Sequence, residues 1–179
     1  MIRFLFLGIL LISLFVNYLN FNSNILQKHL LHDAANDQYS FKTNFFSPIH
    51  YSFPNLALNS VPIESYLSRY ATNDMDFKSA INMLNNSMLN NPNCIYSRYL
   101  LSRNYIYLKD YYKSSEYLEK IFHESPKIEA TTSLYIAVLS ELKDSERLKK
   151  IFPVISKIKN KLVWDFYINS INQPFFFRQ

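Results

Sequence analysis

Residues 95–126 read IYSRYLLSRNYIYLKDYYKSSEYLEKIFHESP, and their pattern returns at an interval of 34 residues before and after. The interval joins three aspartates, Asp76, Asp110 and Asp144, and two prolines, Pro92 and Pro126. It also joins three sets of mostly large apolar residues: Leu67, Leu101 and Tyr135; Ala71, Tyr105 and Leu139; Leu84, Leu118 and Phe152. Leucines recur at many spacings in helices, whereas a joint register of aspartate and proline seldom arises by chance. It predicts a repeated pair of helices.

The residue types fit the turns of such a repeat. Each aspartate falls where a second helix would begin, and there a carboxylate accepts hydrogen bonds from free backbone N–H groups and complements the helix dipole. Pro92 and Pro126 come just after the second helix, where its internal hydrogen bonding has ended. Ala80 and Ser114 are small residues at matching positions, where we expect the two helices of a pair to cross closely.

The middle unit resembles a tetratricopeptide repeat. At the positions that this family specifies it carries Leu101, Ser102, Tyr105, Ser114, Leu118 and Pro126. The resemblance implies an all-α fold, an α-solenoid of about three helical hairpins at 61–92, 95–126 and 129–160, closed by a capping helix from Leu162 to Ile171. These elements would form a domain over 61–172, followed by a tail at 173–179. The third unit lacks its closing proline and has Leu148 at the small position.

Glycine and cysteine are scarce, with Gly8 and Cys94 as the sole examples in the sequence. A P-loop or a dinucleotide-binding motif needs several glycines at fixed spacing, so the sequence excludes nucleotide enzymes of those kinds. One cysteine allows neither an intrachain disulfide nor a cysteine-based zinc cage. The net charge is +5, but the basic residues do not form a nucleic-acid-binding motif, so we expect no nucleic-acid partner.

Residues 1–22 are predicted to anchor the chain in a membrane. Residues 4–19 read FLFLGILLISLFVNYL and hold no charge, which approaches the length that spans a bilayer. Arg3 precedes this stretch and no charge follows it through Asn24, so the positive-inside rule places Met1 in the cytoplasm. We expect a single-pass protein of the bacterial cytoplasmic (inner) membrane with a periplasmic C-terminal domain. The alternatives are a cleaved signal peptide and the last transmembrane helix of a longer protein.

Residues 23–60 would join the anchor to the repeats. The pattern up to Asp37 predicts an amphipathic helix, either continuous with the anchor or kinked against it. From Gln38 to Asn59 the chain is rich in aromatic residues and contains Pro48 and Pro54. We expect an irregular segment that packs on the surface of the domain.

The sequence offers no catalytic constellation, so we predict a protein that is not an enzyme and uses no cofactor. His29, His32 and Asp33 lie close together on one helix face, but no further ligand is evident nearby, and we predict no metal site. Cys94 has no neighbouring histidine and is interpreted as a small packing residue.

The candidate binding residues are arginines and tyrosines of the first helices, which would line the groove of a solenoid. Arg69 and Arg103 are 34 residues apart, and Tyr96, Tyr99 and Tyr107 lie on or near the same face. Arginine beside tyrosine offers a forked donor and a rigid contact area. We predict that these five residues bind a protein partner, through a peptide carboxylate, or an anionic glycan. The alternative is that the arginines are solvated and some of the tyrosines pack inward.

A narrower resemblance rests on short motifs: Ser47-Pro48, Phe53-Pro54-Asn55-Leu56, Val61-Pro62-Ile63, Ser68-Arg69-Tyr70 and Asn90-Asn91-Pro92. These resemble the periplasmic C-terminal tail of bacterial O-antigen ligase/polymerase family proteins, although Ser68 and Ala71 depart from that family's Ala-Arg-Tyr-Tyr element. The resemblance implies a membrane-anchored scaffold associated with cell-surface polysaccharide (O-antigen) assembly. Two alternatives stay open: a non-catalytic fragment or subunit of such a membrane enzyme, and a cleaved, soluble periplasmic repeat protein.

Overall fold

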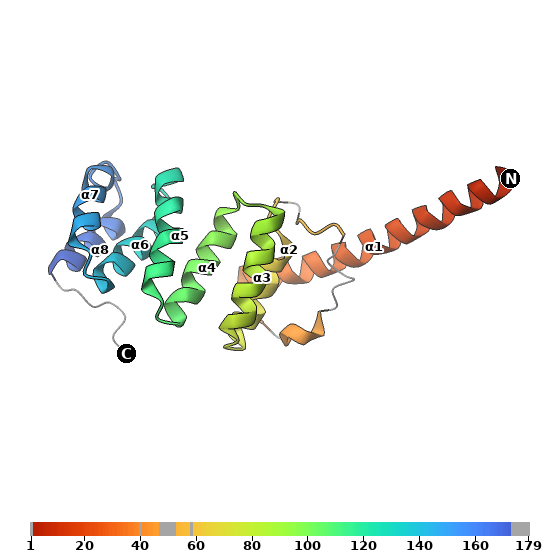
Figure 1. The fold of residues 1–179 in the computed structure, drawn as a ribbon, viewed down its shortest axis with the longest axis horizontal. Helices are drawn as coiled ribbons and strands as arrows, with labels where there is room; N and C mark the ends of the chain where they lie inside the picture. The colour runs from red at the N-terminus through yellow and green to blue at the C-terminus, as the bar shows by residue number, and fades with distance from the viewer. Residues whose placement is uncertain (1, 40, 47–52, 58, 173–179) are drawn as a thin grey trace. The chain divides into compact units, whose positions relative to one another are not determined.

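The computed structural model describes residues 2–39, 41–46, 53–57 and 59–172, and these are predominantly helical (Figure 1). The elements are α1 (Ile2–Asn36), the 3-10 helix η1 (Thr43–Phe45), α2 (Ile63–Asn73), α3 (Phe77–Asn90), α4 (Ile95–Tyr107), α5 (Tyr111–Glu124), α6 (Glu129–Glu141), α7 (Ser145–Ile155) and α8 (Lys161–Asn172). The described ranges contain no β-strand, and their one β-bridge is an isolated pairing of Leu56 with Pro62. The prediction of an all-α fold is confirmed.

The chain forms two compact units, Met1–Ser97 and Arg98–Gln179, and the boundary between them falls inside α4. Unit 1 holds α1, η1, α2, α3 and the first turn of α4. Unit 2 holds the rest of α4 and α5 to α8. The predicted solenoid would run through both units, so the stacking of its helix pairs stays a prediction.

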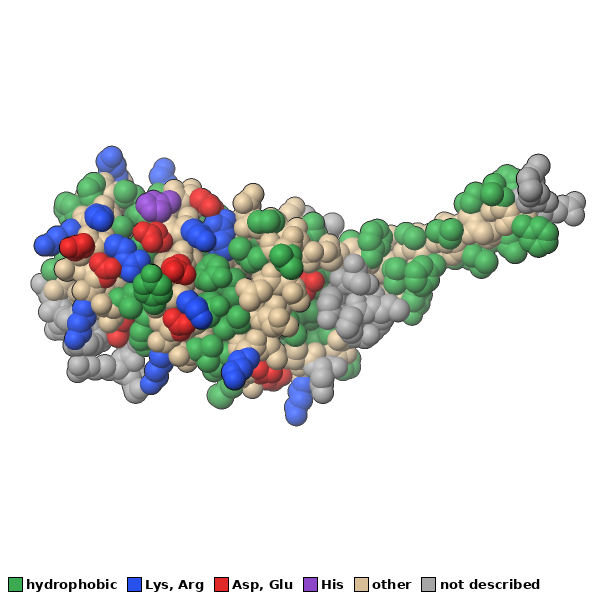
Figure 2. Space-filling view, viewed as in Figure 1, with side chains coloured by type: hydrophobic (Ala, Val, Ile, Leu, Met, Phe, Trp, Pro, Cys, Tyr) green, Lys and Arg blue, Asp and Glu red, His purple; other side chains and the backbone are tan. Residues whose placement is uncertain are grey.

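The N-terminal helix α1 is unbroken over 35 residues, about 52 Å at 1.5 Å per residue. Its first part exposes large apolar side chains on every side, visible along the helix in Figure 2. From Ser23 onward one face is buried against the rest of unit 1. The predicted anchor and amphipathic helix are therefore one continuous element, which is long and apolar enough to cross a membrane.

The core of unit 1 forms where the second half of α1 packs on α2. Leu26 and Leu30 of α1 are buried in one cluster with Ile63, Leu67 and Tyr70 of α2. A ring of serine hydroxyls lies where α2 and α3 meet the first turn of α4: Ser65, Ser87 and Ser97 are fully buried, and their Oγ atoms are 2.6 to 2.7 Å apart. Mutual hydrogen bonding lets each buried hydroxyl donate once and accept once.

The same type of turn connects α2 to α3, α4 to α5 and α6 to α7. In each, a residue with positive φ precedes the aspartate that caps the next helix: Met75–Asp76, Lys109–Asp110 and Lys143–Asp144. The carboxylates accept from the amides of Ser79, Lys113 and Arg147 at 3.1, 3.1 and 2.9 Å. The aspartate amides donate back to the carbonyls of Ala71, Tyr105 and Leu139 at 2.8, 2.8 and 2.9 Å. This is a Schellman helix end that leads directly into an N-cap, and the prediction that the aspartates begin the second helices is confirmed.

The turns after α3 and α5 also match each other. Their C-cap residues, Asn91 and Ser125, have φ of −145° and −148°, and each cap amide donates to the carbonyl four residues earlier. Pro92 and Pro126 follow these caps directly, as predicted. The third pair differs because Pro153 lies inside α7 and the helix ends two residues later, at Ile155. Proline removes one backbone donor and crowds the turn that precedes it.

The core of unit 2 brings α6 together with α5, α7 and α8. Helix α8 buries Val163 and Tyr167 in this core and occupies the range predicted for the capping helix. In α7 the buried residues are Leu148, Ile151 and Ile155. Phe152 occupies the repeat position of Leu84 and Leu118, which are both fully buried, but it is itself 44% exposed. Its ring lies against those of Trp164 and Tyr167 of α8.

Candidate functional site

A pocket of about 320 Å³ lies in unit 2 beside the turn between α4 and α5. We call it the Arg103 pocket. Its lining consists of Arg103, Ile106, Tyr107, Lys109, Tyr111 and Leu134. Among these described residues there are two cations, two phenols and no carboxylate. The pocket therefore has the chemistry of a site for an anionic group with an apolar body.

Arg103 is held between two tyrosine rings on one face of α4. Its guanidinium carbon lies 5.8 Å from the centre of the Tyr99 ring and 5.9 Å from that of Tyr107, and its Nη2 donates to Tyr107 Oη at 2.9 Å. The three residues follow each other at intervals of four, which places them along one side of a helix. Stacking between rings orders the guanidinium, which is a forked donor of the kind that binds carboxylates.

Arg69 and Tyr96 lie in unit 1 and form a different arrangement. Arg69 Nη1 donates to the carbonyl of Ala34 at 2.9 Å and to Tyr96 Oη at 3.1 Å, and Nη2 donates to Asp37 at 2.9 Å. The guanidinium also lies 5.0 Å from the centre of the Tyr39 ring, and the side chain is 19% exposed. These contacts tie the last turn of α1 to α2, so they favour a structural role for Arg69.

The structure thus brings Arg103, Tyr99 and Tyr107 together and places Arg69 with Tyr96. That the five line one groove stays a prediction, because they are divided between the two units.

Lys109, Tyr111, Ile106 and Leu134 are the pocket residues that the sequence analysis missed. Lys109 occupies the left-handed position of the turn, with φ of 59°, where a glycine would have been the usual local signal. Burial, together with the nearby Glu141, raises the pKa of Tyr111, so its phenol stays protonated at neutral pH. The 34-residue register would have found Lys109, since Lys143 precedes the next capping aspartate in the same way.

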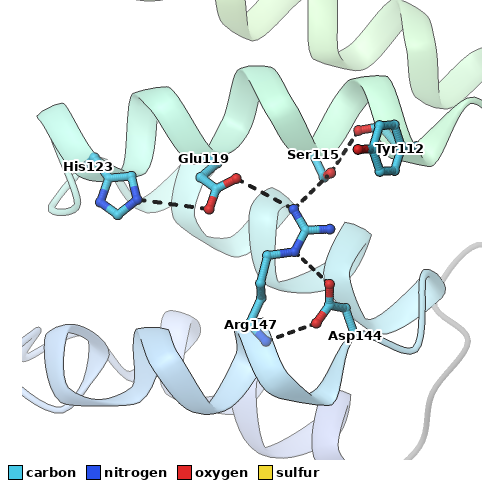
Figure 3. Close-up of polar contacts among 6 residues, drawn as sticks. All are labelled: Tyr112, Ser115, Glu119, His123, Asp144 and Arg147. Atoms are coloured by element: carbon cyan, nitrogen blue, oxygen red, sulfur yellow. Dashed lines mark hydrogen bonds and ion pairs between the residues drawn. The ribbon is translucent and has the colours of Figure 1, made fainter.

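Another polar cluster of unit 2, drawn in Figure 3, joins the start of α7 to α5. Arg147 Nε donates to Asp144 Oδ2 at 2.6 Å, and its Nη1 lies 3.3 Å from Ser115 Oγ and 3.5 Å from Glu119 Oε2. Glu119 also lies 4.0 Å from His123 Nε2. The guanidinium of Arg147 is engaged by two carboxylates, Asp144 and Glu119, so we assign the cluster a structural role.

Arg98 also forms an ion pair to which we assign a structural role. It is 4% exposed and binds both carboxylate oxygens of Glu124 at 2.7 Å, and these bonds lower the pKa of Glu124. The pair places a cation beside the C-terminal end of α5, where it complements the helix dipole.

The residues considered for metal binding or catalysis are placed as follows. His32 Nδ1 lies 3.4 Å from Asp33, whose other carboxylate oxygen accepts a hydrogen bond of 2.6 Å from Tyr70. Cys94 is buried. Within the part of the chain that the structure covers, no three His, Cys, Asp or Glu side chains gather in a way that could hold a metal ion. Comparison with protein-family models, curated proteins and solved structures finds no match to this chain, so the candidate site rests on the chemistry of its residues.

Proposed function

We propose that the protein is a membrane-anchored repeat protein, without catalytic activity of its own, that binds an anionic group of a partner in the Arg103 pocket. The observation that carries the proposal is the position of Arg103, which is braced by Tyr99 and Tyr107 and shares a pocket with Lys109. A braced guanidinium beside a second cation pays little entropy on binding a carboxylate, because its side chain is already ordered.

The size of the pocket defines the kind of ligand. Small-molecule sites occupy roughly 300 to 1,000 Å³, and this pocket of about 320 Å³ lies at the lower end of that range. It suits the terminal group of a larger partner, such as the carboxylate of a peptide C-terminus or the acidic ring of a glycan. Ile106 and Leu134 supply the apolar wall against which the body of that group would pack.

The repeated turns support the tetratricopeptide part of the proposal. Three Schellman ends lead into aspartate caps at equal intervals, and two of the pairs share a second type of turn at proline. Recurring local geometry at a fixed interval is what a solenoid of helix pairs requires.

The membrane part of the proposal rests on α1. The helix exposes its apolar residues over the length of a bilayer core, and its first basic residue, Arg3, comes before that stretch. We place the N-terminus in the cytoplasm and the two units on the other side of a bacterial cytoplasmic membrane. The motif resemblance to O-antigen ligase tails extends this to a role in surface-polysaccharide assembly, for which an acidic glycan would be the natural ligand of the Arg103 pocket.

The binding part is tested with full-length protein in detergent micelles. The probes are short oligogalacturonates, a peptide with a free C-terminal carboxylate, and their uncharged counterparts, the methyl ester and the peptide amide. We expect one of the acidic probes to bind and its uncharged counterpart not to bind.

The variants then locate the site. Hydrogen bonds to charged groups contribute roughly 1.5 to 3 kcal/mol, so Arg103→Ala should weaken binding by about 10- to 100-fold. Lys127→Ala is the matched control, since it removes the same charge from an exposed position just after the other end of α5. Equal binding by Arg103→Ala and the unaltered protein, or binding by neither acidic probe, would contradict the proposal.

A further inference from the structure

The segment before α2 returns to α1 at the point where the apolar stretch ends. Ser23 Oγ donates to the carbonyl of Pro54 at 3.2 Å, and Gln27 Nε2 donates to Ser23 Oγ at 3.2 Å. Ser23 is fully buried. These bonds fix Phe53 and Pro54 beside α1, one helical turn beyond Leu19.

Large apolar side chains near this level of α1 are exposed and are not part of the core. Tyr18, Phe21 and Ile25 of α1 are exposed, Phe21 by 65%, and Phe53 is 50% exposed. From Phe4 to Gln27 the sequence of α1 contains no charged residue. Exposed aromatic groups in an uncharged setting are unfavourable in water and are typical of the interface between lipid and water.

The dimensions of α1 place this junction at the membrane surface. Twenty residues from Phe4 to Ser23 rise about 30 Å, which equals the thickness of the hydrocarbon core of a bilayer. The headgroup layer adds roughly 5 to 7 Å on each side, so Phe53, which is held beside Ser23, falls at its inner edge, and Phe21 lies about 3 Å inside the hydrocarbon core. Asn22 lies close to the edge of the hydrocarbon core, and its side chain donates to Tyr18 O of the same helix at 2.9 Å.

We propose that Phe53 forms a second membrane contact, in addition to the one that Tyr18, Phe21 and Ile25 make as part of α1, and that it seats unit 1 in the headgroup layer of a phospholipid bilayer. The inference rests on the proposed insertion of α1, because continuity with that helix places the contact. The contact would resist tilting of unit 1 about α1, since it holds the domain to the lipid at a point outside the helix axis.

Tryptophan fluorescence in nanodiscs tests the contact. Trp164 is replaced by phenylalanine, and single tryptophans are introduced as Phe53→Trp, as Leu11→Trp in the apolar part of α1, or as Met75→Trp. The nanodiscs contain phosphatidylcholine, with or without bromine near the top of the acyl chains. Met75 is the control position and is 79% exposed. It follows α2, and Tyr70 of α2 binds Asp33, which lies about 15 Å further along α1 than Ser23 and is therefore further from the membrane.

We expect bromine to quench the tryptophans at positions 53 and 11 and to leave the one at position 75 bright. A quenched tryptophan at 11 with an unquenched one at 53 would overturn the second contact and leave the insertion of α1 intact. An unquenched tryptophan at 11 would refute the insertion itself. A blue-shifted but unquenched tryptophan at 53 would mean that protein covers this surface, and it would also overturn the inference. Matching circular dichroism of all variants controls for folding.

Discussion

Replacement of the capping aspartates separates the contribution of the cap from that of the contacts around it. Asp110 and Asp144 begin α5 and α7 with nearly the same backbone angles, φ and ψ of −87° and 70° against −83° and 74°. Asp110 accepts from the amide of Lys113 at 3.1 Å and lies 3.3 Å from its exposed Nζ. Asp144 accepts from the amide of Arg147 at 2.9 Å and, in addition, from its half-buried guanidinium at 2.6 Å.

The two alanine variants should therefore lose different amounts of stability. Asp110→Ala removes a cap and an exposed ion pair, and the free energy of unfolding should fall by about 1 kcal/mol. Asp144→Ala removes an equal cap and also one carboxylate partner of Arg147, which is itself partly shielded from water. We expect a loss of roughly 2 to 3 kcal/mol. Asparagine caps a helix as well as aspartate does. Asp110→Asn should therefore leave the free energy of unfolding nearly unchanged, and Asp144→Asn should lose only the contribution of the ionic contact with Arg147.

The pH dependence of the free energy of unfolding measures separately what the negative charge of Asp144 contributes to stability. The hydrogen bonds from the amide and guanidinium of Arg147 lower the pKa of Asp144 in the folded protein. A depressed pKa means that this stabilisation is complete above the unfolded value of about 3.9 and is lost as the pH falls through the folded value. Asp144→Asn should flatten the loss of stability in that acid range.

The assay is urea unfolding of the full-length protein in mild detergent, followed by far-UV circular dichroism, with stability referred to the midpoint and slope of each curve. Equal destabilisation by Asp110→Ala and Asp144→Ala would refute the reasoning, because the guanidinium contact would then contribute nothing. An Asp110→Asn variant as unstable as Asp110→Ala would show that Asp110 does not act as a cap.

Two further predictions concern unit 1. Met75→Gly should stabilise the protein by about 0.5 to 1 kcal/mol in urea unfolding, because Met75 has a φ of 60° that glycine adopts without strain; a loss of stability would contradict the assigned turn. Tyr70→Phe should cost about 1.5 to 3 kcal/mol, because it removes a 2.6 Å hydrogen bond to the carboxylate of Asp33 and leaves the tyrosine site otherwise filled. Unchanged stability would show that this bond does not hold α1 to α2.

The sequence predicted the structure well where a residue type favours one particular backbone geometry. Aspartate at a helix start and proline after a helix end act within a few residues, so their spacing predicted the turns at Asp76, Asp110 and Asp144. It also predicted the two turns at Pro92 and Pro126. Pro153 is out of register with the other two, and its position inside α7 was not anticipated.

The candidate site depended on contacts that the repeat pattern does not encode. Arg69 and Arg103 occupy equivalent positions in sequence, yet Arg69 binds Ala34 and Asp37, which lie more than 30 residues earlier and outside the repeats. No periodic argument predicts that the end of α1 would reach this arginine. Conversely, Arg103 with Tyr99 and Tyr107 follows from helical spacing alone, and the sequence was sufficient to group them.

The most direct test of the proposed function is the side of the membrane on which the helical units lie. Cys94 is buried, so it is replaced by alanine, and Met75→Cys supplies an exposed thiol in unit 1. Ile2→Cys, placed before the apolar stretch, supplies the cytoplasmic control. Spheroplasts are treated with a maleimide that does not cross membranes. We predict that the cysteine at 75 is labelled in intact spheroplasts and that the cysteine at 2 is labelled only after lysis. Labelling of the cysteine at 75 only after lysis would contradict the proposal that α1 carries these units across a membrane.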